Sequence, residues 1–141
     1  MKILFICKHN KFRSKIAEIY FRKINKNKEI TVSSSGLILG SSQKSNLEFG
    51  IAKEFKIKIS GKSKPTTTNL LREQDLVILV ANDVPKSLFN YPYLKNKVQQ
   101  WKITDELLHR KNNVRKIIRK IMKKVEELNK KLEKNGESTN R

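Results

Sequence analysis

The chain has 141 residues, of which 37% are hydrophobic and 32% charged, so its length suits one compact domain with a lean core. Its 32 Lys and Arg residues against 13 Asp and Glu give a formal net charge of +19, which favours anionic partners. No apolar run approaches the roughly 18 residues of a membrane helix, and Met1 opens onto a strand-like segment rather than a signal peptide. These features exclude a membrane-spanning protein and predict a cytoplasmic domain.

Hydrophobic periodicity predicts strands and helices that alternate along the chain. A short apolar run at 2–6 indicates the first strand, and apolar residues at helical spacing indicate a helix over 15–26. The later predicted elements are strands at 30–34, 75–80 and 97–101 and helices at 46–55 and 106–134. The apolar stripe of the last helix fits a coiled-coil seam or packing against a sheet, and we favour packing.

Strands that alternate with helices imply parallel βαβ units. The runs KILFI and LVILV are apolar on both faces, which is typical of a sheet covered on both sides. We therefore predict an α/β fold, a three-layer sandwich with a four-stranded parallel sheet. The predicted domain covers 1–134, and 135–141 is predicted to be a flexible tail.

The segment 7–14, CKHNKFRS, lies where the first predicted strand ends and the first long helix begins. A loop that enters a helix N-terminus presents unpaired N–H groups and the positive end of the helix dipole, which together bind anions. Cys7 at such a place is favoured as the reactive thiolate. Arg13 can grip two oxygens of a phosphate, and Ser14 can donate its hydroxyl to the sulfur. The alternative is a buried structural thiol, against which the polar loop argues.

Metal sites and disulfides are not expected. Cys7 is the only cysteine, so a disulfide framework and a site built from several cysteines are excluded. His109 stands alone on its predicted helix without a companion ligand. No metal or cofactor is therefore predicted.

The segment ILFICKHNKFRSKIAE resembles the opening of the low-molecular-weight protein tyrosine phosphatases, whose loop of cysteine, five residues, arginine and Ser or Thr follows the first strand. The same fold and opening serve the thioredoxin-linked arsenate reductases. The similarity continues at VSSSG (32–36), DLVILVANDVP (75–85) and WKITD (101–105), and it covers the chain from its first residue to about 132.

The resemblance implies roles for particular residues. Cys7 would attack phosphorus and form a phosphocysteine intermediate, while Arg13 and the loop amides bind the phosphoryl oxygens. Asn10 would brace the loop in a left-handed conformation, and Asp105 would protonate the leaving oxygen. The implied phosphate-binding residues are Lys8, His9, Asn10, Lys11, Phe12, Arg13 and Ser14.

Two of the three aspartates compete for the role of general acid. Asp75 starts a buried strand and is expected to cap or pair there. Asp83 lies just past the carboxyl end of that strand, where sites form in α/β proteins, and Asp105 follows the fourth strand on the same edge. We favour Asp105, chiefly on the resemblance, and keep Asp83 as its rival.

The resemblance implies a cysteine-dependent phosphatase that hydrolyses phosphomonoesters, with protein phosphotyrosine as the expected substrate. Two alternatives stay open: an arsenate reductase that uses an external thiol, because the chain has no resolving cysteine, and a non-catalytic anion- or RNA-binding domain. The expected partner is a phosphorylated protein or a small phosphomonoester. The charge is compatible with nucleic acid, but no nucleic-acid motif accompanies it, and no membrane partner is expected.

Overall fold

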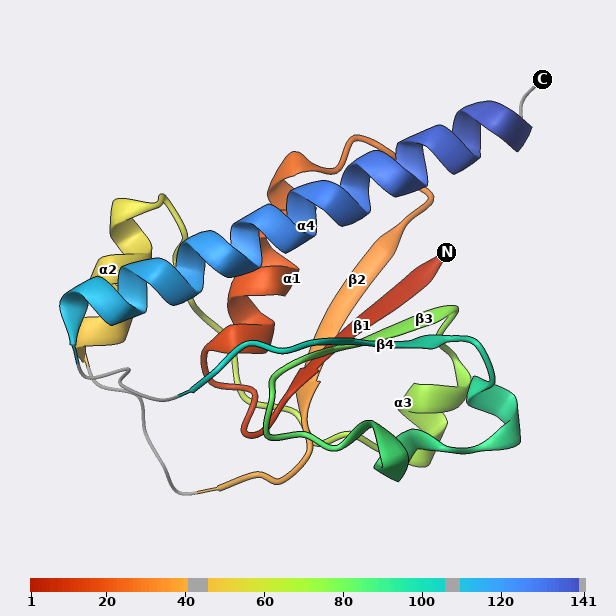
Figure 1. Ribbon diagram of the computed structural model, residues 1–141, viewed down its shortest axis with the longest axis horizontal. Coiled ribbons are helices and arrows are strands. Elements are labelled where there is room, and N and C mark those ends of the chain that lie inside the picture. Colours follow the sequence, from red (N-terminus) through yellow and green to blue (C-terminus); the bar gives the residue numbers. More distant parts are fainter. Residues whose placement is uncertain (41–45, 106–109, 140–141) are drawn as a thin grey trace.

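A computed structural model of the chain describes residues 1–40, 46–105 and 110–139 (Figure 1). The strands are β1 (Lys2–Cys7), β2 (Thr31–Gly36), β3 (Leu76–Val80) and β4 (Val98–Trp101). The helices are α1 (Arg13–Ile24), α2 (Asn46–Glu54), α3 (Thr68–Arg72) and α4 (Lys111–Thr139), with short 3-10 segments η1 (Lys86–Phe89) and η2 (Pro92–Leu94).

The strands form one sheet in the order β2-β1-β3-β4, and every neighbouring pair is parallel. In register, Ile6 of β1 lies opposite Ser35 of β2 and Leu79 of β3. Because the strands are parallel, their carboxyl ends meet at one edge of the sheet. The predicted four-stranded parallel sheet is confirmed, and this edge carries the segments that follow β1, β3 and β4.

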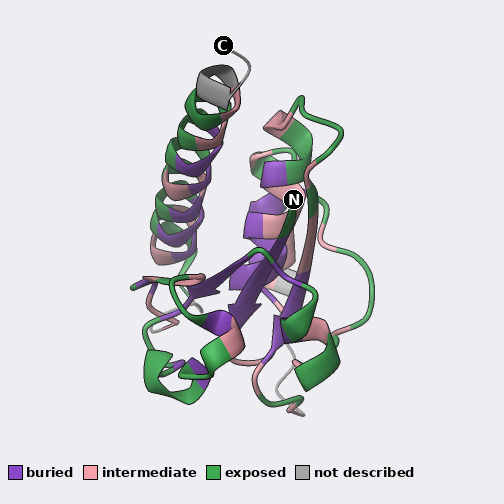
Figure 2. Cartoon of the chain, turned by 90° about the vertical axis from the view of Figure 1, so that its right-hand side faces the viewer, coloured by how far each residue is buried: buried purple, intermediate pink, exposed green. Residues whose placement is uncertain are grey.

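The side chains of the two central strands alternate between the two faces of the sheet. Ile3 and Phe5 belong to the core under α1, α2 and α4, whereas Leu4 and Ile6 belong to the core on the opposite face. This alternation explains why both faces of the β1 sequence are apolar, since each face is covered. Figure 2 shows buried residues on the sheet, on α1 and along one side of α4.

The two covering layers differ in size. Helices α1 and α4 pack together and on the first face, where Ile118 and Ile121 of α4 are fully buried. The other face is covered by α3, η1 and η2, which contribute Leu71, Phe89 and Leu94. The apolar stripe of the long helix therefore packs into the domain core, as expected. None of the helices in the described ranges is long and apolar enough to cross a membrane.

Some predicted boundaries differ from the structure. Helix α1 begins two residues before the predicted start at 15, because Arg13 and Ser14 already form its first turn. Helix α4 continues to Thr139, beyond the predicted end at 134, because an established helix gains a hydrogen bond with each added residue. The predicted start of this helix, at 106–109, lies outside the described residues. The division into a domain over 1–134 and a tail stays a prediction.

Candidate active site

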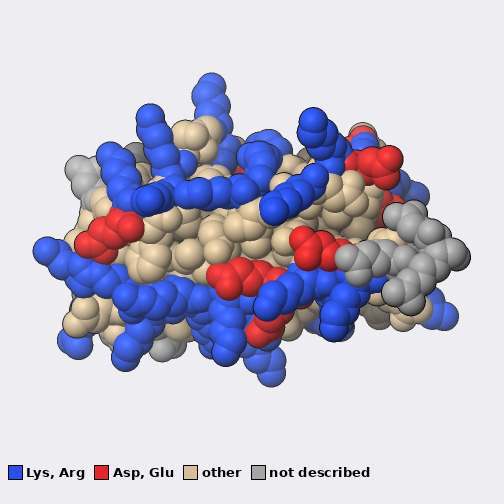
Figure 3. All heavy atoms as spheres, turned by 90° about the horizontal axis from the view of Figure 1, so that it is seen from above, with Lys and Arg blue, Asp and Glu red and all other residues tan. Residues whose placement is uncertain are grey.

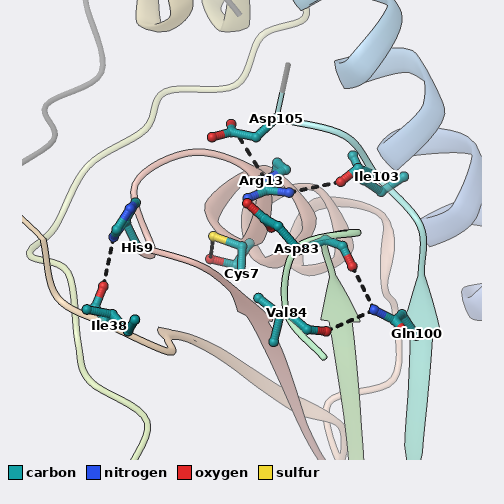
Figure 4. Close-up of polar contacts among 11 residues, drawn as sticks. Cys7, His9, Arg13, Ile38, Asp83, Val84, Gln100, Ile103 and Asp105 are labelled. Carbon is teal, nitrogen blue, oxygen red and sulfur yellow. Dashed lines mark hydrogen bonds and ion pairs between the residues drawn. The ribbon is translucent and has the colours of Figure 1, made fainter. Parts of the chain in front are cut away.

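The loop between β1 and α1 lies at the carboxyl edge of the sheet (Figure 4). Asn10 adopts a left-handed backbone with φ of 55°, as expected for an asparagine in this loop. The end of β2 packs directly against the loop, because a Cβ added at Gly36 would lie 2.8 Å from the carbonyl carbon of His9 and 2.9 Å from the amide nitrogen of Asn10. Only glycine fits there without displacing the loop.

The thiol of Cys7 is buried at the bottom of this loop, with 3% of the residue exposed. Its Sγ lies 3.0 Å from Oγ of Ser14, and Asn10 donates to the same Oγ over 2.8 Å. Because Ser14 Oγ already accepts from the amide of Asn10, its own hydrogen is available to the sulfur. This arrangement allows the hydroxyl of Ser14 to donate a hydrogen bond to the sulfur of Cys7.

Phe12 is the residue that anchors the loop to the domain. Its side chain is 1% exposed and belongs to the large core under α1 and α4. Phe12 is also the N-cap of α1, and its side chain makes no capping hydrogen bond. The first amide groups of α1 are therefore suited to bind an anion above the sulfur.

Arg13 is 2% exposed, and three groups hold its guanidinium (Figure 4). Nη1 donates to the carbonyl of Ile103 and Nη2 to Oδ1 of Asp83, both over 2.9 Å. Nε lies 3.7 Å from Oδ1 of Asp105. Both aspartates that compete for the role of general acid thus reach the same guanidinium. The shorter contact makes Asp83 a support for Arg13, a role that its place in the sequence does not reveal.

The segment that carries Asp83 is held by Gln100 of β4. Nε2 of Gln100 donates to the carbonyl of Ala81 over 3.1 Å and to the carbonyl of Val84 over 2.9 Å. The two bonds close residues 81–84 into a fixed turn and so set the position of Asp83 beside Arg13. The sequence analysis missed Gln100, and no motif marks it.

His9 forms one wall of the site. Its Nδ1 lies 2.8 Å from the carbonyl of Ile38, and because a carbonyl only accepts, Nδ1 is assigned as the protonated nitrogen. Gly40 lies against the ring, since a Cβ there would come within 2.8 Å of Cε1. His9 is thus half-buried and held against the segment after β2.

The predicted residues converge on one small cavity. Its lining residues are Cys7, His9, Lys11, Phe12, Arg13 and Asp105. A larger hollow, of about 720 Å³, lies between η1, η2 and the start of β4 and contains none of these groups. We place the site at the smaller cavity because the buried thiol and guanidinium are there. Within the described ranges, no group of three His, Cys, Asp or Glu residues could hold a metal ion.

The other predicted phosphate-binding residues lie on the same loop. Lys8 and Lys11 are half-buried, whereas Asn10 and Ser14 are fully buried. Asn10 also donates to Oγ of Ser34 in β2 over 2.9 Å, so the loop is tied to the neighbouring strand as well as to α1. All the residues predicted to bind phosphate are therefore adjacent in space.

Comparison with known proteins identifies the family. The sequence model of the low molecular weight phosphotyrosine protein phosphatases matches residues 2–138, nearly the whole chain. The chain belongs to this family. The resemblance inferred from 7–14 is thereby confirmed, and the protein is a cysteine-based phosphatase that acts on phosphorylated substrates. A sequence search of curated proteins found no match.

Solved structures share the family fold at low identity. A protein tyrosine phosphatase from Entamoeba histolytica is 20% identical with a TM-score of 0.84, covering 96% of this chain and 99% of its own. The YwlE arginine phosphatase from Geobacillus stearothermophilus is 19% identical with a TM-score of 0.78, covering 95% and 94%. An arsenate reductase from Archaeoglobus fulgidus is 21% identical with a TM-score of 0.67, covering 90% and 98%. At these identities the phosphatase and reductase structures show the fold alone.

Proposed function

We propose that the phosphatase hydrolyses phosphomonoesters in two steps, with Cys7 as the nucleophile and protein phosphotyrosine as the substrate. The observation that carries this proposal is the contact between Sγ of Cys7 and Oγ of Ser14, at the N-terminus of α1 and beside the buried Arg13. A nucleophile, a group that stabilises its anion and a cation for the phosphoryl oxygens lie within one loop.

In the first step, the thiolate of Cys7 attacks phosphorus and the bond from phosphorus to the leaving oxygen breaks. The leaving oxygen takes a proton from Asp105, so the products are phosphocysteine and a neutral alcohol or phenol. The role of Asp105 as the general acid is supported by its position on the cavity wall, opposite the loop that bears the sulfur.

In the second step, water attacks the phosphorus of phosphocysteine. Asp105, now a carboxylate, takes a proton from the water, and the bond between sulfur and phosphorus breaks to return the thiolate and release inorganic phosphate. The hydroxyl of Ser14 assists this departure because it donates to the sulfur as negative charge returns.

Arg13 stabilises the phosphoryl oxygens, and its neighbours prepare it to do so. The hydrogen bonds to Ile103 and Asp83 orient the guanidinium before the substrate arrives, so less reorganisation is needed in the transition state. A planar guanidinium can bind two oxygens at once, which an ammonium group cannot reproduce.

Protein phosphotyrosine as the substrate is supported by the family and by the rim of the site. Ile38 and Leu39, on the segment to which His9 is pinned, are 55% and 50% exposed and offer an apolar surface to a phenyl ring. The structural neighbour from Geobacillus stearothermophilus is described as an arginine phosphatase, so phosphoarginine is the comparison substrate. A cytoplasmic location is part of the same proposal and rests on composition.

The test compares wild type with Cys7→Ser. We expect wild type to hydrolyse p-nitrophenyl phosphate and phosphotyrosine peptides, and Cys7→Ser to lose this turnover. The same assay includes phosphoserine and phosphoarginine peptides, and arsenate with an external thiol. Faster turnover of phosphoarginine, or reduction of arsenate without phosphatase activity, would contradict the proposed substrate. Activity retained by Cys7→Ser would contradict the proposed nucleophile.

A further inference from the structure

A second cleft, of about 360 Å³, adjoins the phosphate loop on the side of α2. The loop and α1 contribute one wall, α2 contributes Phe49, and the turn that follows Ile59 contributes the other wall. Its lining residues are Asn10, Lys11, Lys15, Phe49, Ile59, Ser60, Gly61, Lys62 and Ser63. Lys11 also lines the cavity that contains Cys7, so the two hollows meet at this side chain.

The turn that carries Lys62 is fixed to the phosphate loop. Nζ of Lys15 donates to the carbonyl of Lys62 over 3.1 Å, and Oγ of Ser63 donates to the carbonyl of Asn10 over 3.0 Å. Gly61 has a left-handed backbone with φ of 90°, a conformation that residues with a side chain adopt only with strain. Lys62 therefore has a defined position relative to the loop, whereas a lysine on a loose segment would not.

The cleft is cationic. Of its three lysines, Lys15 is buried and its Nζ is bound to the backbone carbonyls of Ser60 and Lys62. The side-chain ammonium groups of Lys11 and Lys62 make no hydrogen bond or ion pair with a described residue. Burial lowers the pKa of the Lys15 amine, and its hydrogen bonds to the carbonyls of Ser60 and Lys62 make this lysine part of the scaffold of the turn. No acidic residue is among the described residues that line the cleft.

We propose that this cleft binds a second anionic group, a carboxylate or a phosphate, on the same substrate chain as the phosphorylated residue. The inference rests on the proposed function, in which the phosphoryl group of the substrate lies above Cys7. From there the adjoining segment of the substrate extends past Lys11 and places the second anion in the cleft. Phe49 and Ile59 supply an apolar surface for the intervening segment of the substrate. The substrate class is thus a phosphoprotein segment that is acidic near its phosphorylated residue.

A second anion in this cleft does not touch the reacting atoms. Its contacts are the same in the ground state and in the transition state, so it lowers KM and leaves kcat unchanged. Lysines that are partly open to solvent each contribute little, so two of them are expected to change kcat/KM by about fivefold to tenfold. Because the contacts are electrostatic, the gain decreases as salt is raised.

The experiment uses phosphotyrosine peptides in which one neighbouring position carries Glu, its neutral isostere Gln or phosphoserine, with the substitution moved along the peptide. The measured quantity is the ratio of kcat/KM for the Glu and Gln peptides, so that any general change in activity cancels. In wild type we expect a ratio of about five to ten at the best position, entirely through KM. In Lys62→Ala we expect the ratio to fall to about two. A larger gain with phosphoserine than with Glu identifies the second anion as a phosphate.

The matched control is Lys28→Ala, which removes one exposed lysine from the segment before β2, at the opposite edge of the sheet. It should leave the wild-type ratio unchanged. A ratio near one at every position in wild type, or an equal fall in Lys28→Ala, would overturn the inference.

Failure to hydrolyse even p-nitrophenyl phosphate would overturn the proposed function instead. The cleft is then tested by calorimetric titration of Cys7→Ser and Cys7→Ser/Lys62→Ala with the same peptides, where equal Kd values for Glu and Gln peptides overturn it.

Discussion

Helix α1 has two regions of different character. In its first turn Arg13, Ser14 and Lys15 are polar and yet buried, and each has defined hydrogen-bond partners. Farther along, the helix buries apolar residues such as Phe21 against the sheet and α4, as an ordinary amphipathic helix does. Burying polar groups is costly unless they are paired, so the first turn indicates function and the rest indicates packing.

The same contrast separates Arg13 from most other cations of the chain. Figure 3 shows Lys and Arg side chains over much of the face that includes α4. Arg115 is paired there with Glu54 over 2.9 Å, which lowers the pKa of that carboxyl through the hydrogen bond, but this pair is exposed and screened by salt. Position and burial, rather than the number of charges, distinguish the cation of the site.

Among substitutions that leave the nucleophile in place, the largest effect is expected at the proposed general acid, Asp105. Asp105→Asn should slow hydrolysis of phenyl phosphate by roughly two to four decades, the usual worth of general acid catalysis. The deficit should be smaller with p-nitrophenyl phosphate, because its leaving group needs little protonation. Steady-state kcat/KM for the two esters measures the difference.

Asp83→Asn is the matched control for this prediction. Since Asp83 holds Arg13 over 2.9 Å, its loss should lower kcat/KM for both esters by a similar factor. If the loss of kcat/KM in Asp83→Asn depends on the leaving group and the loss in Asp105→Asn does not, the two roles must be exchanged.

Arg13→Lys is expected to have the next largest effect, although it keeps the charge. An ammonium cannot bind two phosphoryl oxygens in one plane, so kcat/KM should fall about a hundredfold, equivalent to about 3 kcal/mol of transition-state binding. Kinetics with p-nitrophenyl phosphate measure this loss. Activity within a few fold of wild type would show that the buried guanidinium does not bind the phosphoryl group.

A substitution in the packing region of the molecule should lower stability and leave catalysis unchanged. Ile118→Val removes one methylene from a fully buried residue of α4 and should lower the free energy of unfolding by about 1 kcal/mol. Denaturant unfolding measures this change, while kcat/KM of the folded protein should stay at the wild-type value. A change in kcat/KM of tenfold or more would contradict the separation of the two regions.

The smallest expected effect concerns the contact between α1 and α4. Oη of Tyr20 donates to Oε1 of Glu126 over 2.8 Å, and burial followed by this bond raises the pKa of Tyr20 to about 12. The folded state therefore holds the phenol proton more tightly than the unfolded state, so this stabilisation is present below about pH 10 and is lost as pH rises toward 12.

Tyr20→Phe should be less stable than wild type by about 0.5 kcal/mol at neutral pH, because the hydrogen bond is exposed. The difference should shrink between pH 10 and 12, as measured by urea unfolding of both proteins. A difference that grows over this range would contradict the direction of the pKa shift.

Local patterns were sufficient to predict the sheet and the left-handed turn of the loop between β1 and α1. The apolar runs of β1 and β3 are buried on both faces, and the left-handed Asn10 sits where a strand turns into a helix. These features are determined by residues that are adjacent in sequence, so they can be predicted from the sequence alone. Helix α3 was missed because Thr68–Arg72 is too short to show helical periodicity.

The contacts between distant segments could not be predicted in the same way. Asp83 and Asp105 both follow a strand at the active edge, and only the folded chain shows that both reach Arg13 and that Asp83 is closer. Gln100 acts on the carbonyls of a turn 16 to 19 residues earlier, an interaction without a sequence pattern.

The central claim is that catalysis passes through a phosphoryl group on Cys7. It is tested most directly by quenching wild-type protein in acid during turnover of p-nitrophenyl phosphate and mapping its peptides by mass spectrometry. With this leaving group the second step should limit turnover, so the peptide that contains Cys7 is predicted to carry one phosphoryl group. Continued turnover with Cys7 unmodified, or with the phosphoryl group on another residue, would contradict the account.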